Sequence, residues 1–364
     1  MTALLPEGFR DTLPPFADAA AAVEARVLGA AASHGYERAD PPLAEFADGL
    51  GSRLKDGGLR NAVRFVDPVS QRTLAIRPDL TAQIARIAAT RMAHHPRPVR
   101  LSYAGPVLKL RGDALNPARE ARQIGAELIG LASVAAARAV VTVAVDALEA
   151  AGASGISIDF TLPDLVDAMA ATLPVADVDA LRERLDAKDA GGVAALAPAY
   201  LPLIAAAGPF PDALERLRAF DTHGILASRI AGLGEIVDSL GDRVQLTLDP
   251  TERHGFEYQT WLGFSLFVKG VDREVGRGGT YRIVREDGTE EMATGFSLYA
   301  DALVGAVAPE RRRLFLPYGT PAAEGAGMRA AGWVTVAALE AEDTPEAQLC
   351  THILDRGEAR PLGG

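Results

Sequence analysis

The chain has 364 residues, of which 48% are hydrophobic and 23% are charged, with 37 basic and 48 acidic side chains. This length suggests about two domains with a large core, and so apolar a composition excludes intrinsic disorder. The acidic balance argues against a general nucleic-acid binder, whose affinity depends on Lys and Arg neutralising phosphates. The single cysteine, Cys350, excludes an intrachain disulfide framework and a cysteine-rich zinc site.

The sequence offers no signal peptide and no membrane span. Its N-terminus lacks an apolar region after a basic start. The longest uncharged stretch, residues 190–211, is long enough to cross a bilayer, but four prolines break it, and Gly191 and Gly192 open it. We therefore expect a cytoplasmic protein without membrane contact.

Hydrophobic periodicity predicts a mixture of helices and strands in the first half of the chain. A glycine at position 35 ends the first helix. The expected elements are a helix over residues 16–34, strands over 63–66 and 73–76, a helix over 80–92, a strand–loop–strand pattern over 99–129, a helix over 132–150 and a strand over 154–160.

Residues 161–245 differ from the sequence on either side. They are rich in Ala, Leu and Asp, are punctuated by Pro and Gly, and read as several short helices that form an insertion. They carry 7 basic and 13 acidic residues, which disfavours this surface as a phosphate-binding face.

The second half returns to strands that come in clusters with short connections. They are expected over residues 244–249, 261–270, 280–286 and 290–297, followed by a helix from 298 and a strand–helix–strand unit over 313–339, with another strand at 350–354. This order predicts an α+β fold with a mostly antiparallel sheet flanked by helices. We expect a core domain over 1–310 and a small C-terminal α/β domain over 311–364.

Five sequence blocks, in order, resemble histidyl-tRNA synthetase, which has the class II aminoacyl-tRNA synthetase fold. The blocks are LPEGFRDTLPP, LAIRPDLTAQIARIA, RLSYAGPVLKLR with REARQIGAELIG, ERHGFEYQTWLGFSLF and GRGGTYRI. Together they span roughly residues 5–305. The resemblance implies the synthetase-type fold for the core, with residues 161–245 as its insertion.

The sequence departs from the synthetase where the synthetase binds ATP and tRNA. Lys109 replaces the arginine of the second motif, Arg111 replaces a glutamate, and Ala302 replaces the arginine of the third motif. Lysine lacks the planar fork that grips phosphate in two places, and alanine offers nothing. Residues 311–364 carry 6 basic and 7 acidic residues, so they are too short and not basic enough for an anticodon-binding domain.

A synthetase-like chain that has lost these sites is similar to the regulatory subunits of ATP phosphoribosyltransferase. The resemblance implies a non-catalytic partner of the short-form catalytic subunit, which joins ATP and phosphoribosyl pyrophosphate in the first step of histidine biosynthesis. It implies activation of that subunit, feedback inhibition by free histidine, and a dimer within a hetero-octamer. No cofactor, no metal and no tRNA partner are expected.

Histidine needs a carboxylate for its ammonium group and polar partners for its imidazole nitrogens. By resemblance, Asp79 and Thr81 hold the amino group, although an Asp or Thr after proline is also an ordinary helix cap. Gln123 and Glu127 alternate with apolar residues along a predicted strand and share one face, about 13 Å apart. By resemblance they contact the amino-acid backbone and the imidazole; the alternative is a solvated outer face.

The resemblance places further histidine-binding residues near Gly255. Either His254 or Arg253 takes the place of the synthetase's catalytic arginine, while Tyr258 matches its first tyrosine and Gln259 replaces the second. For His254 the alternative is a surface or capping histidine. The expected set is completed by Lys109 and by two glycines whose backbone approaches the ligand, Gly278 and Gly279.

Two other functions remain open on the sequence alone. One is a catalytically active, divergent histidyl-tRNA synthetase or another amino-acid-activating enzyme. The other is an assembly scaffold that keeps the partner contacts and does not respond to histidine.

Overall fold

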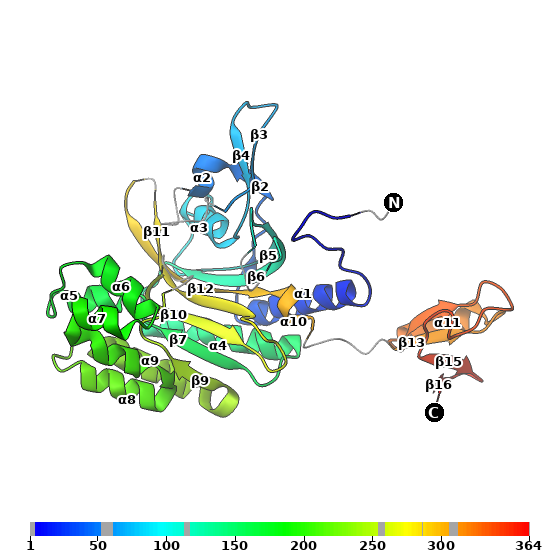
Figure 1. Cartoon of the computed structure of the whole chain (residues 1–364). Coiled ribbons are helices and arrows are strands. Elements are labelled where there is room, and N and C mark those ends of the chain that lie inside the picture. The colour runs from blue at the N-terminus through cyan, green and yellow to red at the C-terminus, as the bar shows by residue number, and fades with distance from the viewer. Residues whose placement is uncertain are drawn as a thin grey trace. The chain divides into compact units, whose positions relative to one another are not determined.

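A nine-stranded sheet runs through the larger of two compact units, Met1–Val307 and Ala308–Gly364 (Figure 1). The computed structural model describes residues 4–51, 61–112, 117–253, 259–285, 287–305 and 312–363. In spatial order the strands are β1 (Glu37–Arg38), β5 (Val99–Leu108), β6 (Glu120–Ile129), β12 (Glu290–Tyr299), β11 (Gly276–Val284), β10 (Gln259–Phe267), β7 (Ser157–Thr161), β9 (Gln245–Leu248) and β8 (Gly208–Pro209).

The sheet is mostly antiparallel, as the clustered strands and short connections predict. Only the pairs β1–β5 and β7–β9 run parallel. The β7–β9 pair is parallel because the chain between these two strands crosses over through the helical segment 161–245, as parallel neighbours require.

Long helices cover one face of the sheet (Figure 1). They include α1 (Phe16–Ser33) and α4 (Val134–Ala151), which share one hydrophobic core with the strands. The hydroxyl of Ser133 accepts the Ala136 N–H at 3.1 Å and so caps α4, and Gly152 ends it in the left-handed conformation. Residues of β6 at alternate positions face this core: Ile124, Ala126 and Leu128.

The opposite face carries a smaller helix, α3 (Thr81–Ala89), and a second apolar cluster. Beside it lies a three-stranded antiparallel sheet of β2 (Ala44–Phe46), β4 (Thr73–Ile76) and β3 (Arg64–Val66). Helix α2 (Ala47–Gly51) comes directly after β2 in the chain. These strands and α3 confirm the predicted elements, with helix α3 three residues shorter at its C-terminal end than the periodicity predicts.

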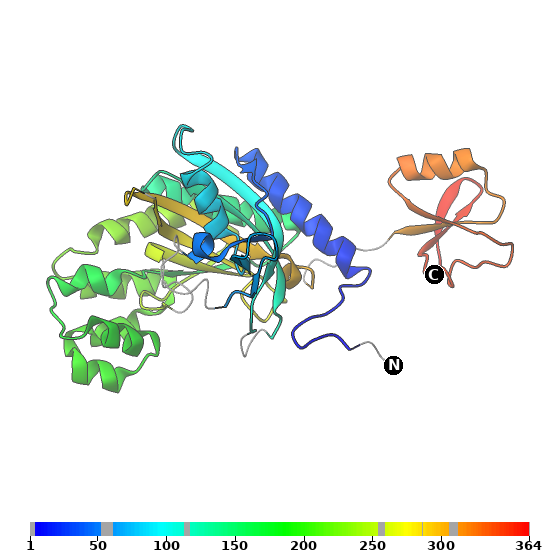
Figure 2. The same ribbon diagram turned by 90° about the horizontal axis from the view of Figure 1, so that it is seen from above.

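Residues 161–245 form short helices, as predicted, at the end of the sheet away from α1 (Figure 2). They are α5 (Leu165–Ala170), α6 (Val178–Asp186), α7 (Ala190–Leu196), η1 (Pro198–Ala206), α8 (Phe210–Phe220), α9 (Ala227–Leu240) and η2 (Gly241–Arg243). Their apolar residues belong to the same cluster as α4, so this segment has no separate core. After β12 the chain turns into α10 (Ala300–Leu303).

The second unit is a four-stranded sheet with one helix. Its strands follow the order β14 (Val334–Ala337), β13 (Arg313–Leu316), β15 (His352–Asp355) and β16 (Glu358–Pro361), and α11 (Ala322–Ala330) joins β13 to β14. The sequence did not predict β16. It pairs with β15 through a two-residue turn in which Arg356 and Gly357 have φ of 51° and 81°. Both central residues of such a turn need positive φ, and Arg-Gly lacks the Asn or Asp that signals it.

Candidate functional site

A polar cleft opens on the α3 face of the main sheet. Residues that line it come from the start of α3 and from four adjacent strands, β6, β12, β11 and β10. They are Asp79, Thr81, Glu127, Gln259, Arg277, Gly278, Gly279, Tyr281, Gly295, Phe296, Ser297 and Tyr299. The cleft therefore gathers residues separated by more than 200 positions in the sequence.

Glycine residues on the neighbouring strands leave room on the sheet for the Glu127 side chain. In the strand register Glu127 pairs with Gly295, and Gly295 pairs with Gly279 on the next strand. A methyl group added at Gly295 would overlap the Glu127 carboxylate, and one added at Gly279 would overlap the Gln259 amide. Glycine is therefore required in both places for these two polar side chains to lie over the sheet.

Glu127 is a carboxylic acid held between two tyrosine hydroxyls. Tyr103 donates to its Oε1 at 3.0 Å and Tyr281 donates to its Oε2 at 2.9 Å. Glu127 is only 1% exposed. Burial raises the pKa of Glu127 to about 8, against the opposing effect of the two tyrosine hydrogen bonds. This group can therefore exchange a proton with a ligand near neutral pH.

A hydrogen-bond chain fixes Asp79 at the other end of the cleft. The amide of Gln123 donates to Asp79 Oδ2 at 2.9 Å and to the Ser297 hydroxyl at 2.7 Å. That hydroxyl lies 2.9 Å from the hydroxyl of Tyr103, so the chain reaches Glu127. Asp79 Oδ1 also accepts the Thr81 N–H at 2.6 Å. Asp79 thus contacts the first turn of α3 and lines the cleft as well, but the N-cap residue of α3 is Leu80, so neither Asp79 nor Thr81 is the ordinary helix cap considered above.

Two further groups give the cleft hydrogen-bonding capacity. Gln259 is 9% exposed, and its Oε1 has no hydrogen-bond partner within the described part of the chain. A buried acceptor of this kind costs about 1–3 kcal/mol unless a ligand or water satisfies it. Arg277 lines the cleft while it forms a two-pronged ion pair with Glu274, at 2.7 and 2.8 Å.

The structure brings most of the predicted binding residues together. Asp79, Thr81, Glu127, Gln259, Gly278 and Gly279 line the cleft, and Gln123 lies directly behind it with no exposed surface. The solvated outer face considered for Gln123 and Glu127 is thus wrong, because α3 and the neighbouring strands bury both side chains.

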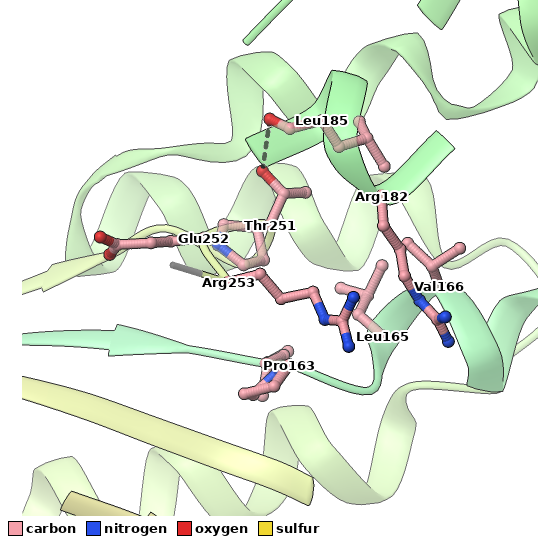
Figure 3. A pocket seen from close by; sticks show the side chains of 10 residues that line it. Pro163, Leu165, Val166, Arg182, Leu185, Thr251, Glu252 and Arg253 are labelled. Carbon is pink, nitrogen blue, oxygen red and sulfur yellow. Dashed lines mark hydrogen bonds between the residues drawn. The ribbon is translucent and has the colours of Figure 1, made fainter. Parts of the chain in front are cut away.

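Four predicted residues are not seen in this cleft. Lys109 follows β5, is half-buried and does not line the cleft. Arg253 lines a second cavity, between the segment after β9 and helix α6 (Figure 3). His254 and Tyr258 lie outside the described residues.

Sequence reasoning missed part of the cleft. Tyr103 and Tyr281 each lie within one of the five blocks but resemble ordinary aromatic residues of a strand. Ser297 and Gly295 also carry no signal of a site in their strand. Their role arises only from the register of β5, β6, β11 and β12, which single-strand periodicity does not define. Arg277 directly precedes the predicted pair Gly278 and Gly279. As the cation of the segment GRGG, it was the one missed residue that the sequence itself could have indicated.

Within the described residues, no helix is long and apolar enough to cross a membrane. The same part of the chain contains no cluster of three or more His, Cys, Asp or Glu side chains suited to a metal ion.

Comparisons with known proteins show which family the chain resembles. A family model described as histidyl-tRNA synthetase matches residues 8–303. The ATP phosphoribosyltransferase regulatory subunit of Rhodospirillum centenum is 44% identical, with 99% of this chain and 96% of the relative covered. That of Paramagnetospirillum magneticum is 41% identical, with 97% and 96% covered.

Two solved structures share the fold. An ATP phosphoribosyltransferase regulatory subunit/histidyl-tRNA synthetase from Bacillus halodurans has a TM-score of 0.77 at 23% identity, covering 96% of each chain. A chain in an ATP phosphoribosyl transferase complex from Thermotoga maritima has a TM-score of 0.58 at 16% identity, covering 75% of this chain and 94% of that one.

Proposed function

This chain belongs to the family of ATP phosphoribosyltransferase regulatory subunits, and we propose that its polar cleft binds free histidine as the feedback signal of histidine biosynthesis. The observation that carries the proposal is the pair of fixed carboxyl groups at the two ends of one cleft. Asp79 and Glu127 are joined by a continuous hydrogen-bond chain.

Each polar part of histidine finds a complementary group in the cleft. Asp79 accepts from the ammonium group, since a carboxylate has lone pairs beyond the two hydrogen bonds already made. Glu127 faces the imidazole and exchanges a proton with it. The unpartnered Oε1 of Gln259 accepts from a ring N–H or from the ammonium group. Arg277 is the cation among the described lining residues and is suited to the ligand's carboxylate.

We further propose that the chain does not make an adenylate. Ala302 lies on α10, is 5% exposed and packs in the main apolar core. An alanine side chain there offers no charge to a phosphate. Lys109 stands where a synthetase has arginine, and Arg111 stands where it has glutamate. Losing a charge-assisted hydrogen bond costs about 1.5–3 kcal/mol, and a bond made only in the transition state lowers the rate accordingly.

The proposed setting is the cytoplasm, with the short-form catalytic subunit as partner. The name of the Thermotoga maritima complex supports a transferase assembly, and the regulatory relatives support the role of this chain within it. In the proposed assembly the chain forms a dimer within a hetero-octamer. It does not bind tRNA, because residues 311–364 carry no basic excess to attract a phosphate backbone.

The proposal is tested with the purified chain and a short-form ATP phosphoribosyltransferase. The chain should co-elute with the catalytic subunit and raise its rate, and histidine should reverse the increase. Glu127→Gln should raise the inhibitory histidine concentration by about 10-fold or more while co-elution is unchanged. The exposed Glu215 on α8 provides the control, since Glu215→Gln makes the same chemical substitution on a different element.

Three results would contradict the proposal in different ways. If the chain neither co-elutes with the catalytic subunit nor stimulates it, the regulatory role is excluded for this pair. Histidine-dependent exchange of pyrophosphate into ATP by the chain alone would favour an active synthetase. Stimulation that histidine does not reverse would leave an assembly scaffold.

A further inference from the structure

A second cavity, distinct from the cleft, lies where the helical segment meets the end of strand β9. It is small, partly open to solvent, and shares no lining residue with the cleft. Its walls are mostly apolar, with Pro163, Leu165, Val166 and Pro250 among them. Two arginine side chains, Arg182 and Arg253, line the same cavity from different elements (Figure 3).

The guanidinium group of Arg253 has no carboxylate partner within the described part of the chain. Its Nε is buried and makes no hydrogen bond there. The nearest acids are engaged otherwise: Asp186 accepts the backbone N–H of Arg253 at 2.7 Å, and the side chain of Glu252 extends away from that of Arg253 (Figure 3). Among the described residues, Arg253 therefore brings to the cavity a positive charge that no carboxylate pairs with.

Arg182 approaches the cavity from α6 with two of its nitrogens already used. Nη1 donates to Asp179 at 2.6 Å, and Nη2 forms an ion pair with Asp167. Its Nε is buried and, like that of Arg253, has no partner in the described chain. The charge of Arg182 is thus balanced by two aspartates, while one of its donors remains unused.

We propose that this cavity binds a small oxyanion, the carboxylate or phosphate group of a metabolite, between Arg182 and Arg253. An arginine Nε–H that is buried without an acceptor costs about 1–3 kcal/mol, and an oxyanion offers lone pairs to both groups. The nearby acids limit the charge that the site takes: Glu252 also lines the cavity, and Asp167 and Asp179 pair with Arg182, so all three repel a multiply charged ligand. The site is suited to a monoanion whose apolar part lies against the prolines and Leu165.

The proposal also has a structural consequence. Arg182 belongs to the segment 161–245, whereas Arg253 follows strand β9 of the main sheet. A bound anion would join the two by hydrogen bonds, in addition to the bond between Asp186 and the backbone of Arg253. Anion binding should therefore stabilise the folded chain. The site does not depend on histidine binding in the cleft.

The test is calorimetric titration of the full chain with inorganic phosphate and, separately, with acetate, at constant ionic strength set by chloride. Saturable 1:1 binding of at least one anion is expected, and the comparison shows which head group the site prefers. Arg253→Gln and Arg182→Gln should each weaken that binding by about 10-fold or more. The exposed Arg218 on α8 is the matched control, and Arg218→Gln should bind as the wild type does.

Two further measurements keep the outcome decisive. Circular dichroism checks that each variant is folded, and Arg253→Lys, which keeps the charge without the fork, should recover part of the affinity. The proposal is overturned if neither anion binds the wild-type chain. It is equally overturned if a folded Arg253→Gln variant binds as tightly as Arg218→Gln.

Discussion

The two faces of the main sheet differ in the side chains that the same strands bury on them. On the α4 face, β6 contributes Ile124, Ala126 and Leu128 to a continuous apolar core. On the α3 face, Gln123 and Glu127 of the same strand are buried just as deeply but belong to a polar network. One face is stabilised by close packing, and the other keeps polar groups in place for a ligand.

This difference teaches where stability and function can be separated. Apolar packing is non-directional, so the α4 face tolerates changes that conserve volume. The polar face depends on each hydrogen-bond partner, since a buried group that loses its partner carries the full cost of desolvation. Substitutions on the first face should therefore change the unfolding free energy without changing ligand affinity, whereas substitutions on the second face should lower ligand affinity as well.

The largest effect on stability is expected on the apolar face. Phe160 is fully buried, with edge contacts to Phe210 at 6.2 Å and to Phe264 at 6.4 Å between ring centroids. Phe160→Ala should lower the unfolding free energy by about 3–5 kcal/mol in urea denaturation, because it leaves a cavity. Phe65→Ala, at the 43% exposed Phe65 of β3, should change it by less than about 1 kcal/mol. Equal losses would mean that the core does not lie where we place it.

A methyl group in the cleft should separate affinity from stability. Gly295→Ala forces the Glu127 carboxylate out of its position, so histidine affinity should fall by more than about 10-fold, with a loss of about 1–3 kcal/mol in stability. Gly234 on α9 has open space around its Cα, and Gly234→Ala is the matched control. Normal histidine affinity in a folded Gly295→Ala variant would contradict the assignment of Glu127 to the ligand.

The buried acid should give the polar face a pH dependence that the apolar face lacks. Glu127 has a pKa of about 8 when folded against an ordinary 4.5, so the folded chain holds a proton that the unfolded chain releases between these values. Its contribution is therefore present below about pH 4.5 and is lost as the pH rises through 8.

Glu127→Gln removes this contribution. Across the window from pH 5 to pH 8, the stability of the variant relative to the wild type should rise by up to about 1 kcal/mol per pH unit. Urea denaturation of both proteins at four pH values measures the difference, which cancels the titration of the other groups. A difference that stays constant with pH would show that Glu127 ionises normally in the folded chain.

The smallest effect on stability is expected at Gln259. Its Oε1 is unsatisfied within the described residues, so Gln259→Leu removes an unfavourable group and should change the unfolding free energy by less than about 1 kcal/mol. Histidine affinity should nevertheless fall, by about 5-fold or more. Unchanged affinity would exclude this amide from the contacts with the ligand.

The sequence predicted the elements of the main sheet better than the site between them. Strands β6, β10 and β12 have strong alternation or apolar runs, and α4 has both a cap and a terminating glycine, so local rules are sufficient for them. The hairpin strand β16 was missed, because its turn is formed by Arg356 and Gly357 instead of a recognisable Asn-Gly or Asp-Gly pair.

The site was only partly predictable, for a reason of register. Resemblance to a family placed Asp79, Gln123 and Glu127, but alternation alone also allowed a solvated face for Gln123 and Glu127. The alignment of Glu127 with Gly295 depends on pairing between strands about 170 residues apart in the chain. The position of Arg253 in the second cavity depends on where helix α6 packs, which no local pattern determines.

The central claim is that the cleft recognises the charged ends and the ring nitrogens of histidine. Calorimetric titration of the wild-type chain with histidine, and in parallel with phenylalanine, tests it most directly, since phenylalanine keeps the ammonium and carboxylate groups but has no ring nitrogen. We predict saturable 1:1 binding of histidine and binding of phenylalanine weaker by about 100-fold or more, because a phenyl ring offers no hydrogen bond to Glu127 or to the unsatisfied Oε1 of Gln259. Equal affinities, or no binding of histidine, would contradict the account.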